Sequence, residues 1–415
     1  MFKKLSLSVF IISPMLVSAQ ATNKDLQLNT ITTAMPFLSI TPDSRSGAMG
    51  DAGTAVSANS NSIYWNTAML NFAKKDAEIS ISYTPWLRQL TNDIHLSYLS
   101  GYKKLGDRQA ITAALRYFSL GEITYTDNLG NVTRNDTPSE FEITGGYAFK
   151  LSDRLSVGLN GKFAYSNLTG GMTTASGAQS KAGIAGATDL SFIYYNEDVR
   201  MGGRNGILGL GATINNVGNK IAYSALQQRD FLPMNLKLGF SYMTEFDKYN
   251  TLTWAVDIQK LLVPTPPNIE AGTGVILSGK NNNVGVISGM LQSFYDAPGV
   301  LVKDPNGTIE SNSGTYSVEK GSRFKEELRE INIATGLEYW YNEMFAMRGG
   351  LFYEHYTKGS RQYVNAGIGL KYNIIGIDIS YLAALKKNNP LANTLRFTLR
   401  FDIGSKSSTK SATPE

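Results

Sequence analysis

Few residues in this chain have the side chains and spacing that catalysis needs. His95 lies two positions before Ser97, which on a strand places a base and a hydroxyl nucleophile on one face. The only other candidate base is His355, between Glu354 and Tyr356. A base without a demonstrable nucleophile and oxyanion site is weak evidence for an active site. We therefore expect a polar lumenal His95, an interfacial His355 and no catalytic residues.

Metal and cofactor chemistry has equally little support. The chain contains no cysteine, which excludes disulfides and thiolate metal sites, and two histidines cannot build a His-rich zinc site. Gly47, Gly50 and Gly53 are evenly spaced, but a phosphate-binding glycine loop needs a preceding strand and a following helix, which this segment lacks. We expect no metal and no cofactor, and we assign these glycines to close backbone approach or positive φ.

The charge balance points to no specific polyanion. The formal net charge is +5, and the charged residues are scattered along the chain. We expect no nucleic-acid partner, and an anionic glycolipid surface or plain solvent as the surroundings of the basic side chains.

The first residues have the form of a secretory signal peptide. Lys3 and Lys4 precede an apolar run from Leu5 to Val17, which ends in the small residues Ser18 and Ala19. We assign residues 1–19 to a cleaved signal peptide. No later stretch approaches 18 apolar residues, so the sequence predicts an exported chain without transmembrane helices.

From Lys75 onward the dominant pattern is a period-two alternation, which is typical of strands with two different faces. In 155–165, 364–372 and 395–401, apolar residues alternate with Ser, Gly, Asn, Lys or Arg. The composition, with 40 Gly, 22 Tyr and 18 Phe, suits a barrel with aromatic girdles. We predict an all-β fold, a transmembrane antiparallel β-barrel of about 14 strands over residues 75–403 with a polar lumen.

The connections between the predicted strands alternate in length. Short turns, as on the periplasmic side of such barrels, fall at 105–108, 152–153, 247–250 and 342–343. Longer connections, assigned to the outer side, run over 121–139, 167–181, 217–230 and, by far the longest, 263–324. This pattern predicts an outer-membrane protein with both termini on the periplasmic side and a polar tail over residues 404–415.

Residues 20–74 form a segment too long for a linker and too irregular for strands. We predict that it fills the lumen as a plug, with a loose periplasmic arm as the alternative. Phe37, Met49, Tyr64 and Trp65 favour a packed plug, because a solvated arm rarely carries such side chains.

Two stretches carry a resemblance to a known family. The predicted plug reads PFLSITPDSRSGAMGDAGTA over 36–55 and NSIYWNTAML over 61–70, and the longest connection contains GMLQSFYDAPGV over 289–300. These stretches resemble the PorV family (also called LptO) of the type IX secretion system, whose barrel is similar to that of the FadL transporters. Thr67 stands where the family usually has Pro, and Ala48 where Gly is common.

The plug part of this resemblance selects a group of residues. They are Pro36, Phe37, Arg45, Gly47, Met49, Gly50, Gly53, Asn61, Tyr64, Trp65 and Asn66. We expect Arg45 to pair a lumenal carboxylate, and Tyr64 and Trp65 to wedge the plug against the wall. For this group, packing of the plug is the expected role ahead of direct contact with a partner.

The resemblance implies a non-enzymatic role in protein secretion. Such barrels accept cargo by its C-terminal secretion domain from a large type IX translocon barrel (SprA- or Sov-like). They then carry it to a surface attachment complex (PorU-like). The implied partners are therefore these proteins and outer-membrane lipid.

Two other functions stay open. A FadL-like transporter of hydrophobic molecules is disfavoured by the polar inward faces, although Leu99, Phe118 and Trp340 are candidates to point inward. A lipopolysaccharide deacylase would need His95 and Ser97 to face lipid. The alternation instead assigns Ile94, Leu96 and Tyr98 to the lipid face, which argues against that activity.

The longest connection is far longer than a hairpin needs, which suggests a function. The residues selected there are Met290, Leu291, Gln292, Phe294, Tyr295, Asp296 and Pro298. The apolar residues have helical spacing, so we predict a short amphipathic helix that ends at Pro298. Its apolar face either binds a protein partner or caps the mouth of the barrel.

Overall fold

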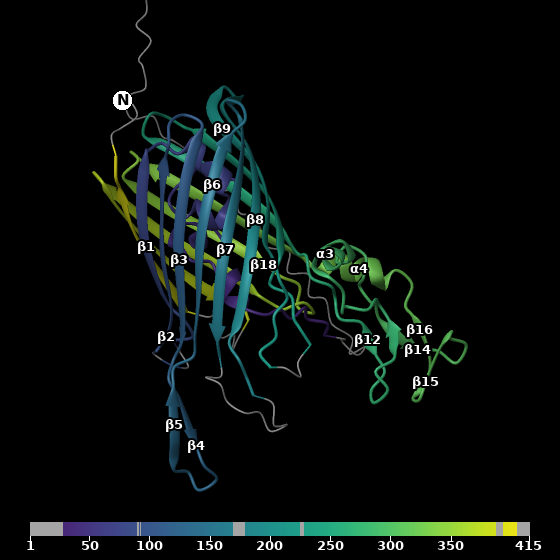
Figure 1. Ribbon diagram of the computed structural model, residues 1–415. Coiled ribbons are helices and arrows are strands. Elements are labelled where there is room, and N and C mark those ends of the chain that lie inside the picture. Colours follow the sequence, from purple (N-terminus) through teal and green to yellow (C-terminus); the bar gives the residue numbers. More distant parts are fainter. Residues whose placement is uncertain are drawn as a thin grey trace, which may run out of the picture.

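The computed structural model describes residues 28–88, 91, 93–168, 179–224, 228–386 and 393–404. The predicted signal peptide and the tail from 405 onward lie outside these ranges. The described chain forms one closed barrel (Figure 1). β1 pairs with β2 on one side and with the last strand, β21, on the other, so the wall has no free edge. The predicted antiparallel 14-strand fold is confirmed.

Fourteen strands make up the wall, and each pairs with the next around the barrel. They are β1 (Ala77–Pro85), β2 (Ile94–Lys104), β3 (Gln109–Leu120), β6 (Ser139–Lys150), β7 (Leu155–Asn167), β8 (Gly183–Met201), β9 (Arg204–Gly218), β10 (Asn235–Glu245), β11 (Asn250–Leu261), β17 (Ile331–Tyr341), β18 (Phe345–Tyr353), β19 (Gln362–Tyr372), β20 (Ile375–Ala384) and β21 (Thr394–Asp402).

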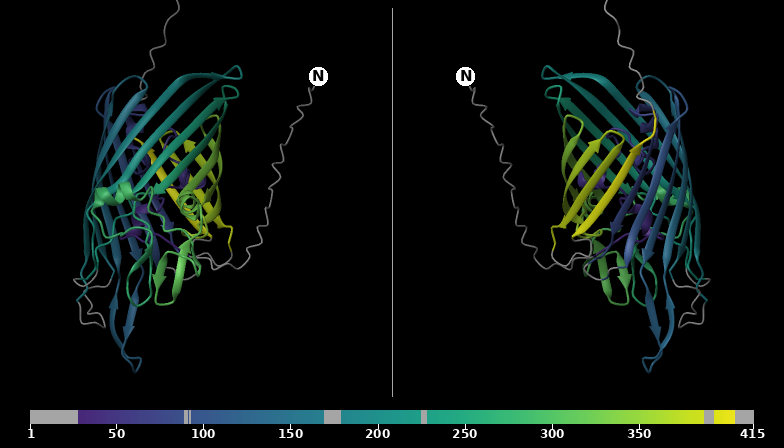
Figure 2. Two further views of the ribbon diagram at one scale, coloured as in Figure 1. Left: turned by 90° about the vertical axis from the view of Figure 1, so that its right-hand side faces the viewer. Right: turned by 90° about the vertical axis from the view of Figure 1, so that its left-hand side faces the viewer.

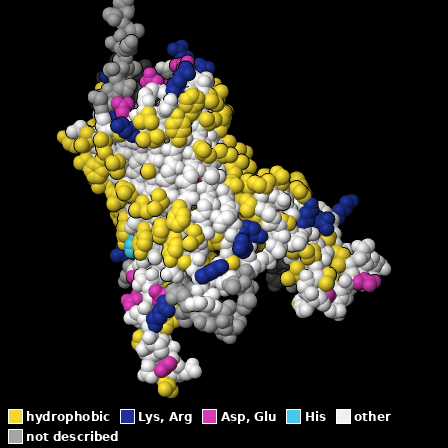
Figure 3. All heavy atoms as spheres, viewed as in Figure 1, with side chains coloured by type: hydrophobic (Ala, Val, Ile, Leu, Met, Phe, Trp, Pro, Cys, Tyr) yellow, Lys and Arg dark blue, Asp and Glu magenta, His cyan; other side chains and the backbone are white. Residues whose placement is uncertain are grey.

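Side chains alternate between the lumen and the outer surface. In β1, Ser80 and Ser82 are buried inside, whereas Ile79 and Ile81 are exposed on the outside. Figure 3 shows hydrophobic side chains spread over the outer wall, with Lys, Arg, Asp and Glu gathered at the two ends and on the long loop. This distribution suits a wall that faces acyl chains outside and polar groups inside.

Short and long connections alternate, as predicted. Turns of two to four residues join β2 to β3, β6 to β7, β8 to β9, β10 to β11, β17 to β18 and β19 to β20. At the opposite end, the connection from β3 to β6 carries the hairpin of β4 (Ile123–Thr126) and β5 (Val132–Asp136), which projects beyond the barrel (Figure 1).

Residues 28–76 are here called the plug. Its two stretches 34–56 and 59–71 are largely buried inside the barrel (Figure 2). The plug contains only short helical turns, which are η1 (Pro36–Ser39), α1 (Ser44–Ala48), α2 (Ser62–Trp65) and η2 (Thr67–Phe72). Because these turns satisfy few backbone groups themselves, the wall must supply many of the plug's hydrogen bonds.

The plug runs in a direction that we did not predict. Asn29 donates from Nδ2 to the carbonyl of Pro266 at 3.1 Å and from its main-chain nitrogen to that of Thr357 at 3.2 Å. Both acceptors lie in long connections. Lys74, at the other end of the plug, pairs with Glu343 in a short turn at 3.0 Å. The described chain thus begins at the end with the long connections and crosses the lumen to reach β1, whereas we expected it on the side of the short turns.

The apolar core lies between the plug and the wall. Phe37 and Leu38 of the plug pack with Leu96 and Phe118 of the wall. A second cluster groups Met49 with apolar residues of β11, β17, β18, β19 and β20. The barrel therefore has a filled interior rather than an open channel.

The connection from β11 to β17, residues 262–330, is called the long loop. It contains β12 (Asn268–Ile269), β13 (Ile276–Ser278), α3 (Val286–Gln292), β14 (Leu301–Lys303), β15 (Ile309–Ser311), β16 (Gly314–Val318) and α4 (Ser322–Arg329). It projects sideways from the rim of the barrel (Figure 1). No helix in the described residues has both the length and the hydropathy to cross a membrane.

Candidate functional site in the plug and the long loop

The plug is braced internally by one buried carboxylate. Asp43 caps α1, because its Oδ2 accepts a hydrogen bond from the main-chain nitrogen of Ser46 at 2.9 Å. Its Oδ1 accepts a second one from the Trp65 indole at 2.7 Å. Asp43 is completely buried, so this single side chain joins α1 to α2 inside the lumen.

Arg45 joins the plug to the wall, as the sequence predicted. Its Nε and Nη2 donate to the two carboxylate oxygens of Glu338 on β17, at 2.8 and 2.6 Å. Its Nη1 and Nη2 also donate to the carbonyl and hydroxyl of Ser57. The guanidinium is therefore bidentate on a carboxylate that is only 1% exposed.

The Arg45 pair is the start of a longer chain of buried charges. Arg348 on β18 donates to Glu338 at 2.6 Å and to Asp378 on β20 at 2.7 Å. Arg400 on β21 donates to the other oxygen of Asp378 at 2.9 Å. It also lies 3.8 Å from Glu78 on β1, and Glu78 accepts two hydrogen bonds from Ser60 of the plug. This series of ion pairs thus starts in the plug at α1 and returns to the plug near α2. Removing one member of such a buried series is costly, because its partners are left unpaired.

Glycines allow the plug and wall backbones to touch. Gly50 has φ +70°, and a Cβ there would lie 2.4 Å from the main-chain nitrogen of Leu351. On the wall, a Cβ at Gly336 or Gly350 would lie 2.3 or 2.1 Å from main-chain atoms of Met49. We predicted that the plug glycines serve close backbone approach or positive φ. At Gly50 both conditions are present.

The other polar residues selected from the plug bind the wall or the plug itself. Asn61 accepts from the hydroxyls of Ser80 and Ser100 at 2.9 and 3.0 Å. Asn66 donates to the carbonyls of Thr54 at 2.9 Å and Phe192 at 3.0 Å. These contacts support the packing role.

The aromatic pair of the plug is wedged between cations of the wall. The rings of Tyr64 and Trp65 meet edge to face at 4.9 Å. Arg116 lies 4.8 Å from the centre of the Tyr64 ring, and Lys237 lies 4.9 and 4.5 Å from the two ring centres. Phe37 is equally buried, whereas Pro36 is exposed on the surface of a cavity described below.

The long loop is fastened to the barrel rim by a second ion cluster. Lys260, at the end of β11, lies 3.3 Å from Glu327 and 2.6 Å from Glu330. Lys358, in the connection from β18 to β19, lies 2.7 Å from Glu326 and 3.0 Å from Glu330. All three glutamates belong to α4 or follow it directly, so this helix holds the loop in place.

The residues selected in the long loop divide into two groups. Leu291, Phe294 and Tyr295 are 63%, 49% and 59% exposed and form the outer side of the α3 region. Met290 instead packs inward against a cluster that includes Phe231 and Val263. The prediction of one shared face for Met290, Leu291 and Phe294 is therefore wrong, because α3 ends at Gln292, before Phe294, and Met290 packs inward.

The end of this helix also differs from the prediction. α3 ends at Gln292, six positions before Pro298, and Ser293 follows as its C-cap. Asp296 is buried and accepts from the main-chain nitrogen of Thr265 at 3.1 Å and from Gln292 at 3.3 Å. Burial, together with Glu330 and Glu327 nearby, raises the pKa of Asp296 to about 6. Gln292, Asp296 and Pro298 thus shape the loop from within.

His95 and Ser97 point outward, which reverses our prediction. Residues paired directly across two strands share a face, and His95 and Ser97 pair with Pro85 and Tyr83 of β1. Tyr83 is an outward residue, and its ring lies 5.5 Å from that of His95. The interior of β2 is occupied by Leu96 and Tyr98, which contact the plug. Leu99, also expected inside, is 46% exposed outside.

Neither histidine has the surroundings of a catalytic base. The only hydrogen-bond partner of His95 in the described residues is the carbonyl of Asp93, at 3.3 Å, and no hydrogen bond joins it to Ser97. His355 contacts Thr357 at 2.9 Å, and burial together with Arg329 and nearby lysines lowers its pKa. Across the described ranges, no group of three or more His, Cys, Asp or Glu is placed to hold a metal ion.

Several wall residues that hold the plug were not selected from the sequence. Asp257 on β11 accepts from the main-chain nitrogens of Gly53 and Thr54, both at 2.9 Å, and from the Thr54 hydroxyl at 2.7 Å. Glu338, Arg348 and the rest of the charge chain were missed in the same way. In the sequence, each of these residues is recognisable only as a charged residue on the polar side of an alternating strand. Its partner cannot be recognised there, because the partner depends on the barrel register.

These features together define an outer-membrane β-barrel protein with a plugged lumen. Among solved structures, the P. putida toluene transporter TodX aligns with a TM-score of 0.46 at 11% identity, over 88% of this chain and 99% of that one. A Pseudomonas aeruginosa FadL homologue aligns with a TM-score of 0.43 at 12% identity, over 90% of this chain and 99% of that one. The barrel assignment rests on the strand pairing itself.

The family is shown by sequence. The model of the family described as type IX secretion system protein PorV matches residues 22–268, more than half of the chain, and the chain belongs to this family. A comparison with curated proteins finds no match.

Proposed function

We propose that this protein is the outer-membrane component of the type IX secretion system that receives cargo and passes it on. It accepts the C-terminal secretion domain of cargo released by a large SprA- or Sov-like translocon barrel. It then carries the cargo to a PorU-like attachment complex at the cell surface. Membership of the PorV family supports a place in this system.

The observation that carries the docking role is the exposed apolar side of α3. Leu291, Phe294 and Tyr295 project from a loop that is fixed to the rim by ion pairs rather than lying loose. Large exposed apolar side chains grouped on an ordered loop are typical of protein contact sites. We infer that this side binds cargo or translocon, with the long connections facing the outside of the cell and the short turns facing the periplasm.

The filled lumen supports transport outside the barrel rather than through it. The plug is held by buried ion pairs at Glu338 and Glu78 and by backbone contacts at Gly50. A folded cargo protein has no route through such an interior. The cargo therefore crosses the membrane elsewhere and meets this protein at the long loop.

The test is co-purification from detergent-solubilised outer membrane. Replacing Leu291 and Phe294 with Ser should abolish recovery of the translocon or cargo without changing heat-modifiability, because strands hold the barrel closed. The matched control is Leu129→Ser in the β4–β5 turn, where an 87% exposed apolar residue is removed from another connection at the same end. Unchanged recovery with the double variant would refute the docking role of α3.

Lipopolysaccharide deacylation is the second candidate function. The outward orientation of His95 and Ser97 favours it, since an acyl chain can reach them from the membrane. The missing hydrogen bond between them disfavours it, since a hydroxyl nucleophile needs its base within reach. We therefore rank it below cargo transfer.

A further inference from the structure

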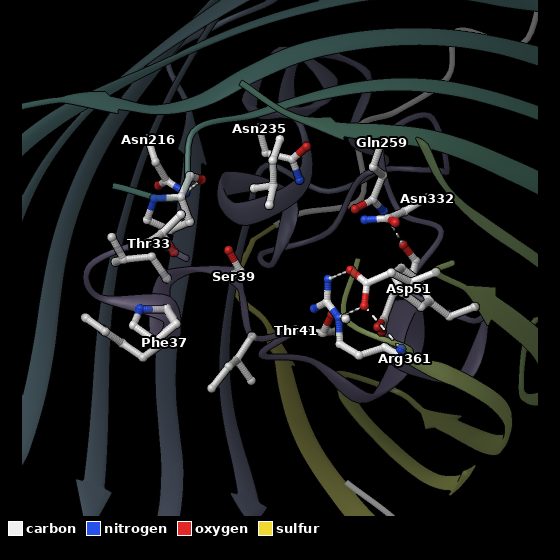
Figure 4. Close-up of a pocket in the computed structure, with 18 of the residues that line it drawn as sticks. Thr33, Phe37, Ser39, Thr41, Asp51, Asn216, Asn235, Gln259, Asn332 and Arg361 are labelled. Carbon is white, nitrogen blue, oxygen red and sulfur yellow. Dashed lines mark hydrogen bonds and ion pairs between the residues drawn. The ribbon is translucent and has the colours of Figure 1, made fainter. Parts of the chain in front are cut away.

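A cavity of about 510 Å³ lies between the plug and the wall, and Figure 4 shows residues that line it. Trp86, Leu120 and Lys358, at the end with the long connections, are among the lining residues. Ligand-binding cavities commonly have volumes of about 300–1,000 Å³. One part of its surface is apolar, with Phe37, Trp86 and Phe118 among the lining residues. The opposite part is polar, and Figure 4 shows Asp51, Gln259, Asn332 and Arg361 there.

Cationic side chains outnumber carboxylates on this surface. Asp51 and Glu354 are the two acids that line it, and the five basic residues are Lys162, Lys237, Lys358, Arg361 and Arg396. Three of the five have an acid of their own nearby. These pairs are Lys162 with Asp189 at 2.9 Å, Lys358 with Glu326 at 2.7 Å and Arg361 with Glu354 at 2.8 Å.

Arg396 has no such partner. It projects from β21, is 3% exposed, and its Nε and Nη1 form no hydrogen bond within the described chain. No carboxylate in the described ranges lies within ion-pair distance of it. A guanidinium that is buried without a partner is costly, so an anion bound beside Arg396 would stabilise it.

Lys237 is the second cation without an acid in contact. It projects from β10, is 5% exposed, and its ammonium group contacts the ring faces of Tyr64 and Trp65. Asp257 and Asp51 act on it electrostatically, but neither is within ion-pair distance. The carboxylate of Asp257 is already bonded to Gly53 and Thr54.

Two acceptors on the same surface also have free atoms. Asp51 Oδ1 and Asn235 Oδ1 are buried and form no hydrogen bond in the described part of the chain. The other oxygen of Asp51 accepts from the hydroxyl of Tyr363. The cavity surface therefore combines cations that have no carboxylate partner with polar residues.

We propose that this cavity binds a small molecule carrying an oxyanion, either a carboxylate or a phosphate, which Arg396 holds, while Lys237, elsewhere on the cavity surface, adds to its positive potential. This site is separate from the docking surface on α3 and does not depend on the secretion role.

The test uses the full-length protein in detergent, with inorganic phosphate as the first probe and chloride at equal ionic strength as the reference. Trp65 and Trp86 line the cavity and are two of the 4 tryptophans of the chain, so their fluorescence reports binding. Phosphate should change this fluorescence saturably and raise the unfolding temperature. Dodecyl phosphate at low mole fraction in the micelle is the second probe, for an oxyanion supplied by a lipid headgroup.

The decisive variants are Arg396→Met and Lys237→Met, each expected to weaken binding at least about tenfold, since each removes a cation from the cavity surface. Without ligand, Arg396→Met should unfold at the same or a higher temperature, because it removes an unpaired buried charge. Lys371→Gln is the control, since Lys371 pairs with Asp402 at 3.0 Å and lies away from the cavity. If Arg396→Met does not insert, Lys237→Met supplies the test.

Each outcome decides the proposal. A response to phosphate that both variants lose supports a free anion as the ligand. A response to dodecyl phosphate alone, lost in both variants, supports a lipid headgroup as the source. No response to either probe, or a response that both variants keep, overturns the site.

Discussion

Removing the carboxylate of Glu338 should release the plug without opening the barrel. Glu338 accepts three short hydrogen bonds, at 2.8 and 2.6 Å from Arg45 and at 2.6 Å from Arg348, and is 1% exposed. The variant Glu338→Ala leaves two buried guanidiniums short of a partner. Removing one partner of a buried ion pair costs about 3–5 kcal/mol. We expect the free energy of plug opening to fall by an amount in this range.

This loss should appear as local opening of the plug. Because each 1.4 kcal/mol is a factor of ten, main-chain amides of residues 44–54 should exchange with solvent roughly 10²- to 10⁴-fold faster than in the unmodified protein. Hydrogen exchange followed by mass spectrometry measures this directly. Peptides from β7 and β8, distant from Glu338, serve as the internal reference and should not change.

The matched control removes an exposed ion pair at the end of the plug. Lys74 and Glu343 lie 3.0 Å apart with side chains that are 77% and 80% exposed. An exposed pair of this kind contributes only about 0–1 kcal/mol, so Glu343→Ala should leave plug exchange nearly unchanged. Equal exchange in Glu338→Ala and Glu343→Ala would refute the reasoning, and faster exchange of β7 would show that the barrel itself had been weakened.

Three further predictions concern the backbone contact, the long loop and the outward histidine. Gly50→Ala should displace the plug and expose it to limited proteolysis, because a Cβ would lie 2.4 Å from backbone of β18; Gly145→Ala, where a Cβ meets no atom within 4 Å, should not. The pKa of Asp296 is raised from 3.8 to about 6, so its contribution to stability is complete below pH 3.8 and is lost as the pH rises through about 6. The protection factors of α3 amides, which correct for the base-catalysed rise of intrinsic exchange with pH, should therefore fall across this window, and Asp296→Asn should abolish that fall. His95→Ala should leave the acylation of the surface glycolipid unchanged by mass spectrometry, and a loss of deacylated species would establish the deacylase.

The wall could be predicted from the sequence because its strands have two chemically different environments. Period-two alternation follows directly from lipid outside and polar groups inside, as at Ile79 and Ser80. The same rule failed at β2, where Leu96 and Tyr98 face the lumen. The plug makes that part of the lumen apolar through Phe37 and Leu38, so an apolar residue no longer marks the lipid face.

The candidate site was only partly predictable for a related reason. Arg45 was expected to pair a carboxylate, but its partner Glu338 lies 293 positions away and is placed by the barrel register. The helical spacing of Met290, Leu291, Phe294 and Tyr295 predicted a helix, and α3 contains the first two, Met290 and Leu291. Which of the two faces outward depends on how α4 fastens the loop to Lys260 and Lys358, which the local sequence does not encode.

The central claim is that this barrel serves protein secretion rather than uptake of hydrophobic molecules. It is tested most directly in a strain that lacks the protein, by measuring periplasmic cargo and fatty-acid uptake together. We predict that proteins with the C-terminal secretion domain accumulate in the periplasm while uptake stays normal. Normal secretion with reduced uptake would contradict the account and would favour a transporter.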